Sequence, residues 1–180
     1  MSTLAIMALG IGAAAVAGKW PGLTHPAAVR AWLQAFPRHR LWGRVLAAVD
    51  LAASAWLVWD MPESWFTPYR QSLWILAPAS GYLVWRYLDE LLAPRALGGL
   101  LLLVAAPVLD AARFHPSPWR LVMVTMAYLW VVAGLVLVSN PWWFRKWTAP
   151  LVATDRRIRL TATAGLLAGL GLVVLGLTVY

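Results

Sequence analysis

Asp50 is the residue whose type and position most directly suggest chemistry. It lies near the middle of a mainly apolar stretch, roughly residues 41–59, that is long enough to cross a bilayer. A carboxylate within a membrane span is costly and often takes part in proton or cation transfer. The alternative is a structural role, in which Asp50 makes a helix-packing hydrogen bond or pairs with a basic group on a neighbouring helix.

A second candidate site combines Asp110, Arg113 and His115 near the end of another apolar stretch. Asp110 and Arg113 are three residues apart, so they could pair on one helix face. An integral membrane enzyme acting on lipid headgroups could use such a group. The same spacing is typical of a structural ion pair at a membrane boundary, and we favour that interpretation.

The other residue types that usually perform chemistry are sparse. The three histidines are His25, His39 and His115, and none lies in the middle of an apolar stretch. They lack the spacing for two axial haem ligands on one helix, although one interfacial ligand at His115 stays open. The absence of cysteine excludes disulfides and thiolate metal sites. We therefore expect no catalytic residues, metal or cofactor, but we do expect bound lipid.

The composition predicts the scaffold that holds these residues. Of the 180 residues, 62% are apolar and only 12% are charged, whereas a soluble domain has about 25% charged residues. The net charge of +8 comes from basic residues between apolar stretches, which indicates membrane orientation rather than nucleic-acid binding. The sequence therefore predicts an all-α, polytopic integral membrane helix bundle.

Hydropathy and breakers place about six transmembrane helices, given that about 20 apolar residues cross a bilayer. Ala15-Val16-Ala17 resembles a signal cleavage site, but no positive segment precedes it, so we expect a first transmembrane helix. We expect this helix to end at the interfacial segment Gly18-Lys19-Trp20-Pro21, because Pro21 is a helix breaker. The third helix is the weakest, because Pro78 is expected to interrupt it. If the third and fourth helices do not cross, four spans remain. The expected spans are residues 3–17, 41–59, 71–87, 91–111, 119–138 and 159–180. In the last of these spans, the spacing of Gly165 and Gly169 predicts a small-residue packing face.

Short amphipathic segments lie between the spans. Pro26–Phe36 places Val29, Trp32 and Phe36 on one helical face, which is typical of a helix at the membrane interface. Most of the 13 tryptophans also fall at predicted span ends, where indole rings anchor a protein at the headgroups. The interface anchors that we expect are Trp32, Trp142, Trp143 and Trp147.

An internal repeat emerges when the chain is shifted by 115 residues without a gap. Pro26 then falls on Pro141, and three further pairs coincide: Arg30 with Arg145, Trp32 with Trp147, and Arg44 with Arg159. This alignment predicts a single transmembrane domain, 1–180, with a possible parallel repeat of 1–60 and 116–180 joined by a helical pair at 61–115. Convergent interface chemistry could produce the same pattern.

The distribution of basic residues predicts the orientation. With six spans, twelve of the 15 lysines and arginines fall on one side, and with four spans ten do. The positive-inside rule makes that side cytoplasmic, so both termini are expected on the non-cytoplasmic side, in a bacterial inner membrane.

The sequence supports two main functional hypotheses. The shortage of buried polar chemistry favours a non-catalytic structural or accessory subunit, possibly respiratory or photosynthetic, that packs against membrane lipids and other integral membrane subunits. The alternative is a small proton- or ion-coupled transporter or channel that uses Asp50, with the interrupted third helix lining its path.

Overall fold

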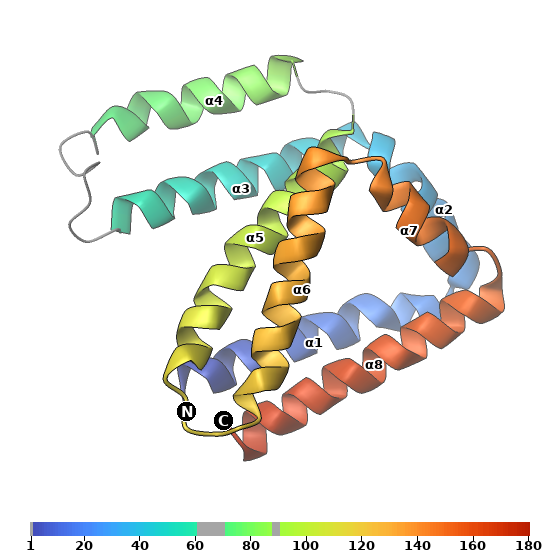
Figure 1. Cartoon of the computed structure of the whole chain (residues 1–180). Helices are drawn as coiled ribbons and strands as arrows, with labels where there is room; N and C mark the ends of the chain where they lie inside the picture. The colour runs from blue at the N-terminus through green and yellow to red at the C-terminus, as the bar shows by residue number, and fades with distance from the viewer. Residues whose placement is uncertain (1, 61–70, 88–90) are drawn as a thin grey trace. The chain divides into compact units, whose positions relative to one another are not determined.

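The computed structural model describes residues 2–60, 71–87 and 91–180 (Figure 1). Within these ranges the chain is helical and contains no β-strand. The elements in order are α1 (Thr3–Thr24), α2 (Pro26–Ala35), the 3-10 helix η1 (Phe36–Arg38), α3 (Arg40–Asp60), α4 (Leu73–Tyr87), α5 (Leu92–Arg113), α6 (Arg120–Ser139), α7 (Trp143–Leu151) and α8 (Asp155–Thr178).

Five of the described helices, α1, α3, α5, α6 and α8, are long and apolar enough to cross a membrane. A sixth, α4, is apolar but shorter, with 15 residues. In a bilayer the backbone must satisfy its own hydrogen bonds, and long apolar helices do so internally. The predicted fold class, an all-α membrane helix bundle, is confirmed.

The end predicted for the first helix, in the segment from Gly18 to Pro21, is wrong, because α1 continues through this proline to Thr24. Proline removes one backbone hydrogen bond, but two other contacts stabilise the helical turn that follows Pro21. The His25 amide donates to the Pro21 carbonyl oxygen at 2.8 Å, and Gly22 is buried against Ala162 of α8. This tertiary contact outweighs the local effect of the proline.

The expected interruption at Pro78 is also absent, since α4 is one continuous helix from Leu73 to Tyr87. In an apolar environment the remaining backbone hydrogen bonds are strong enough to keep the helix intact around one missing donor. The helix therefore does not supply unwound backbone to line a path.

The chain divides into two compact units, residues 1–35, 104–132 and 145–180 in the first and residues 36–103 and 133–144 in the second. In the first unit α1 packs along α8 (Figure 1). The predicted small-residue face of α8 is confirmed, because Gly169 is buried against Gly12 and Gly165 is covered by the stem of Lys19. The core of this unit consists of Leu4, Ala8, Ala105, Val108, Ala112, Met123, Ala127 and Leu172.

The second unit is also built on close backbone approaches. A Cβ atom on Gly98 would lie 2.8 Å from the carbonyl oxygen of Gly134, so α5 and α6 touch through their backbones here. Ala47, Leu92 and Ala96 form a small core between α3 and α5. The rings of Phe36 and Phe144 add a contact with centroids 5.2 Å apart. Small residues thus bring helices together in both units.

The helix boundaries follow the 115-residue offset of the sequence alignment. α1 ends at Thr24 and α6 at Ser139, while α3 begins at Arg40 and α8 at Asp155, and both pairs differ by that offset. The intervening helices α2 and α7 begin two positions out of step, because two turn residues follow Asn140 before α7 starts at Trp143. Gene duplication itself stays a prediction.

Candidate functional site

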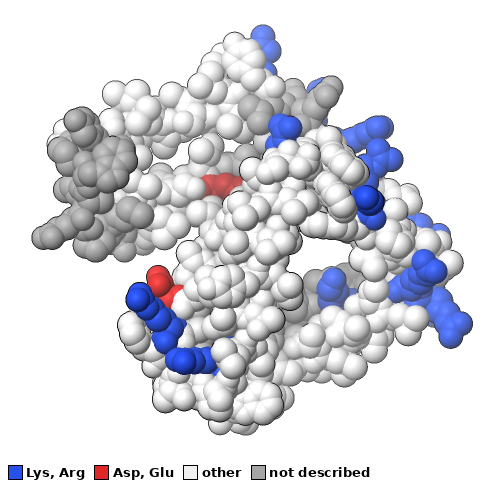
Figure 2. All heavy atoms as spheres, in the orientation of Figure 1, with Lys and Arg blue, Asp and Glu red and all other residues white. Residues whose placement is uncertain are grey.

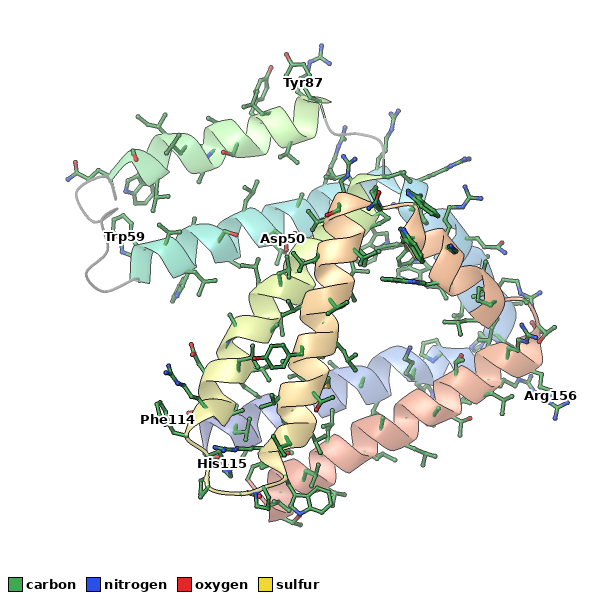
Figure 3. All side chains as sticks on the ribbon, viewed as in Figure 1. Asp50, Trp59, Tyr87, Phe114, His115 and Arg156 are labelled. Atoms are coloured by element: carbon green, nitrogen blue, oxygen red, sulfur yellow. The ribbon has the colours of Figure 1, made fainter. Side chains whose placement is uncertain are left out.

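Asp50 lies in α3 and points toward α5 (Figure 3). Its carboxyl group rests on Gly99, where a Cβ atom would lie 2.7 Å from Asp50 Oδ2. The glycine therefore provides the space that the carboxyl group occupies. Asp50 Oδ1 is buried and has no hydrogen-bond partner. A buried polar atom without a partner is costly, so the position of Asp50 Oδ1 calls for an explanation.

Nothing basic pairs with Asp50 among the described residues, so the structural alternative of an ion pair is not what the structure shows. The space next to this helix is small. A cavity of about 130 Å³ lies between α3, α4 and the start of α5, with Ala47, Leu51, Gly81 and Val84 in its wall. Asp50 does not line this cavity. Its carboxyl group packs on the face of α3 that Gly99 covers.

The group Asp110, Arg113 and His115 does not assemble through direct interactions in the described part of the chain. Asp110 and Arg113 lie in the last turn of α5 but form no ion pair. The Arg113 guanidinium carbon lies 5.1 Å from the ring centroid of Phe114, which is a cation–π distance. The carboxylate and the imidazole are therefore not arranged as a joint acid–base pair.

His115 instead joins a network at the end of α8. The Ser117 amide donates to His115 Nδ1 at 3.3 Å, and His115 Nε2 lies 3.4 Å from the Tyr180 carbonyl oxygen. Because Nδ1 accepts and Nε2 faces an acceptor, these contacts assign the neutral tautomer with the proton on Nε2. The lone pair of Nδ1 thus accepts a hydrogen bond and Nε2 carries the proton, so in this arrangement neither ring nitrogen is directed at a metal or haem.

Tyr180 links three segments of the first unit. Its phenol donates to the Trp119 carbonyl oxygen at 2.7 Å, and its own carbonyl oxygen accepts from the Ser2 hydroxyl at 2.8 Å. The Ser2 Oγ also accepts from the Ala5 amide at 3.1 Å and so caps α1. Partial burial raises the pKa of the Tyr180 phenol above its ordinary value. The network ties α1, α8 and the turn before α6 together, and this tie is structural.

Arg120 completes this region in a way that the sequence did not reveal. Its Nη1 donates to the carbonyl oxygens of Arg113 at 3.0 Å and His115 at 3.1 Å. The last carbonyls of a helix lack partners within the helix, and a cation stabilises them. Arg120 therefore fixes the turn between α5 and α6.

A group of charged side chains lies where α2, α7 and the start of α8 meet in the first unit (Figure 2). Arg30 of α2 pairs with Asp155 of α8 with an N–O distance of 2.5 Å. Arg30 and Arg145, the two arginines that the 115-residue alignment pairs, line the same depression. The 115-residue alignment paired these two arginines in sequence, but it did not predict that they lie close together in space.

The predicted tryptophan anchors lie on or beside the two short helices. Trp32 belongs to α2, Trp143 and Trp147 belong to α7, and Trp142 directly precedes α7. Trp142 is 51% exposed and its ring lies 5.1 Å from that of Trp143. Exposed indoles on amphipathic helices fit the interface role, which stays a prediction.

No family model, curated protein or solved structure matches this chain. Within the described residues, no three histidine, aspartate or glutamate side chains are grouped as metal ligands.

Proposed function

We propose that this chain is a non-catalytic subunit of a larger membrane protein complex, held in a bacterial inner membrane with both termini on the non-cytoplasmic side. The observation that supports the proposal is one face of α1. Its exposed positions from Gly10 to Ala17 carry small residues, and a Cβ atom on Gly10 would have no atom within 4 Å. The face consists of Gly10, Ala13, Ala14 and Ala17.

Small residues on a membrane helix allow the backbone of another helix to approach closely. The exposed side of α6 differs, since Tyr128, Leu129, Val132 and Leu135 are each more than half exposed and present large side chains. Large apolar side chains fit fluid acyl chains well, whereas a small-residue face leaves a groove. The groove on α1 is uncovered within its unit, and a helix of a partner subunit would fill it.

The test is extraction from native membranes in mild detergent, followed by native electrophoresis and mass spectrometry of the band that contains the chain. We expect stable integral membrane partners. Ala14→Leu fills the groove and should release the partners without lowering the melting temperature of the isolated chain. Val132→Leu changes an exposed position on α6 and serves as the control. A wild-type chain that migrates alone would overturn the proposal.

The second candidate function is proton- or ion-coupled transport through Asp50. The observation that favours it is the buried Oδ1 atom without a hydrogen-bond partner. The continuous α4 argues against the path first expected along an interrupted helix. Reconstitution into vesicles with a pH-sensitive dye inside would test proton movement. Loss of flux in Asp50→Asn at equal incorporation would support transport, and equal flux would remove this role for Asp50.

A further inference from the structure

An apolar cavity of about 470 Å³ lies where α1 ends and α2 and α8 begin, inside the first unit. Val29, Trp32 and Leu33 of α2 form one wall, and Ile158 of α8 forms another. Gly18 lies in the wall on α1, and a Cβ atom there would meet nothing within 4 Å. The volume and lining suit part of an acyl chain rather than a polar solute.

A second depression of about 540 Å³ adjoins this cavity, because Leu33 and Val152 line both. Its other lining residues include the polar side chains of Arg30, Gln34 and Thr148, together with Arg145. Leu33 and Val152 therefore form a wall that the apolar cavity shares with this second depression, which we call the basic hollow. This is the distribution of polarity along a phospholipid, from acyl chain to phosphate.

The charges in the basic hollow favour an anion. Among the residues that the structure describes, Asp155 is the acidic side chain that pairs there, and it engages Arg30 through one terminal nitrogen. The Nε of Arg30 is buried and has no hydrogen-bond partner. Arg145 forms no ion pair within the described ranges. Two guanidinium groups against one carboxylate leave a net positive charge, and guanidinium matches phosphate oxygens in geometry.

A third cation, Lys19, lies at the edge of the apolar cavity. The stem of Lys19 packs over Gly165, where a Cβ atom would lie 2.9 Å from the lysine Cγ and Cε, and Lys19 also lines the apolar cavity. Such a stem covers apolar surface while its ammonium group stays in the polar layer. The cavity is therefore bordered by cations at its edge, which matches the headgroup layer of a membrane.

We propose that this junction of α1, α2, α7 and α8 binds one anionic phospholipid. An acyl chain occupies the apolar cavity beside Gly18, and the phosphate lies against Arg30 and Arg145. The site uses the pair of arginines that the internal alignment superposes, one from each short helix. It does not depend on the proposed subunit role.

The test is native mass spectrometry of the full chain in neutral maltoside micelles, where no charged bilayer surface contributes. Phosphatidylglycerol and phosphatidylcholine with the same acyl chains are the probes. We expect a single phosphatidylglycerol adduct that is preferred over phosphatidylcholine. Arg145→Gln leaves the Arg30–Asp155 pair intact and should weaken this adduct about tenfold, the loss of one charge-assisted hydrogen bond.

Three further variants make the test specific. Arg156→Gln removes the same charge from a residue outside both hollows and should bind phosphatidylglycerol as the wild type does. Asp155→Asn removes the competing carboxylate and should strengthen binding. Gly18→Leu fills the apolar cavity without changing charge and should weaken binding. Equal losses in Arg145→Gln and Arg156→Gln would indicate surface charge alone and would overturn the site.

The source of the phosphate is tested separately. Inorganic phosphate should not displace the lipid, because it cannot fill the apolar cavity. If inorganic phosphate competes fully, or if Gly18→Leu binds normally, the hollow is a soluble-anion site and the lipid proposal fails. Melting temperatures of all variants confirm that any loss does not come from unfolding.

Discussion

Gly12 and Gly169 face each other across the contact between α1 and α8, and each fits only because it has no side chain of its own to meet the backbone of the other. A Cβ atom on Gly12 would lie 2.7 Å from the Gly169 carbonyl oxygen, and one on Gly169 would lie 3.0 Å from the Gly12 carbonyl oxygen. Both obstructing atoms belong to backbones, which cannot rotate away as a side chain does. This reciprocal contact sets the distance between the two helices.

Gly12→Ala should therefore destabilise the first unit by about 1–3 kcal/mol, the usual effect of overpacking. Gly10→Ala in the same helix is the matched control, because its Cβ atom would meet nothing within 4 Å. That control should be neutral or slightly stabilising, since alanine favours helix by about 0.5–1 kcal/mol over glycine. Thermal unfolding in detergent measures both. Equal melting temperatures for the two variants would contradict the close approach.

Gly99→Ala should destabilise the second unit through Asp50, because the new Cβ atom would lie 2.7 Å from Oδ2. The double variant Asp50→Ala, Gly99→Ala should recover much of the loss, with a coupling energy of about 1 kcal/mol or more. Gly98→Ala is the control, since its obstruction is the Gly134 carbonyl oxygen and should persist in the Asp50→Ala background. Additive effects of Asp50→Ala and Gly99→Ala in thermal unfolding would contradict the contact.

Tyr180→Phe removes the hydrogen bond to Trp119 and should lower stability by about 0.5–1 kcal/mol, since the contact is exposed. Burial raises the pKa of the phenol above 10.0 in the folded chain. The unfolded chain loses this proton first, so the contribution of Tyr180 is fully present below about pH 10 and is lost as the pH rises further. The difference in melting temperature between wild type and Tyr180→Phe should be constant up to about pH 10 and should shrink as the pH rises above that value. A constant difference would argue against the assigned pKa direction.

The proposed orientation predicts opposite labelling of Phe114 and Arg156, both of which point away from the helices (Figure 3). The chain contains no cysteine, so each introduced thiol is unique. A membrane-impermeant maleimide should label Phe114→Cys in intact cells, because this residue is 84% exposed on the predicted non-cytoplasmic side. Arg156→Cys should react only after the membrane is opened. The reverse pattern would invert the topology.

The sequence predicted the helices well because hydropathy and length decide which segments can cross a bilayer. It also predicted that Gly165 and Gly169 form a packing face, since small residues at that spacing share one side of a helix. Pro21 misled the prediction, because the local effect of a proline is visible in sequence and the packing of Gly22 on Ala162 is not.

The candidate sites were harder to predict, because they depend on residues far apart in the chain. Asp50 was identified from its type and depth, but nothing in its spacing pointed to Gly99 as its neighbour. The pairing of Arg30 with Asp155 bridges 125 positions and has no local signal. Tyr180 likewise meets Trp119 across 61 positions. Such contacts follow from the register between helices, which hydropathy does not encode.

The length of α4 has a consequence for the bilayer around the protein. Its 15 residues amount to about 22 Å of helix, against a hydrocarbon thickness of about 30 Å. A helix this short crosses only where the bilayer thins or where flanking side chains reach outward to the headgroups. Lipids with short acyl chains should therefore favour its insertion, and lipids with long ones should disfavour it. The number of crossings in this chain is thus a joint property of the protein and of the thickness of its membrane.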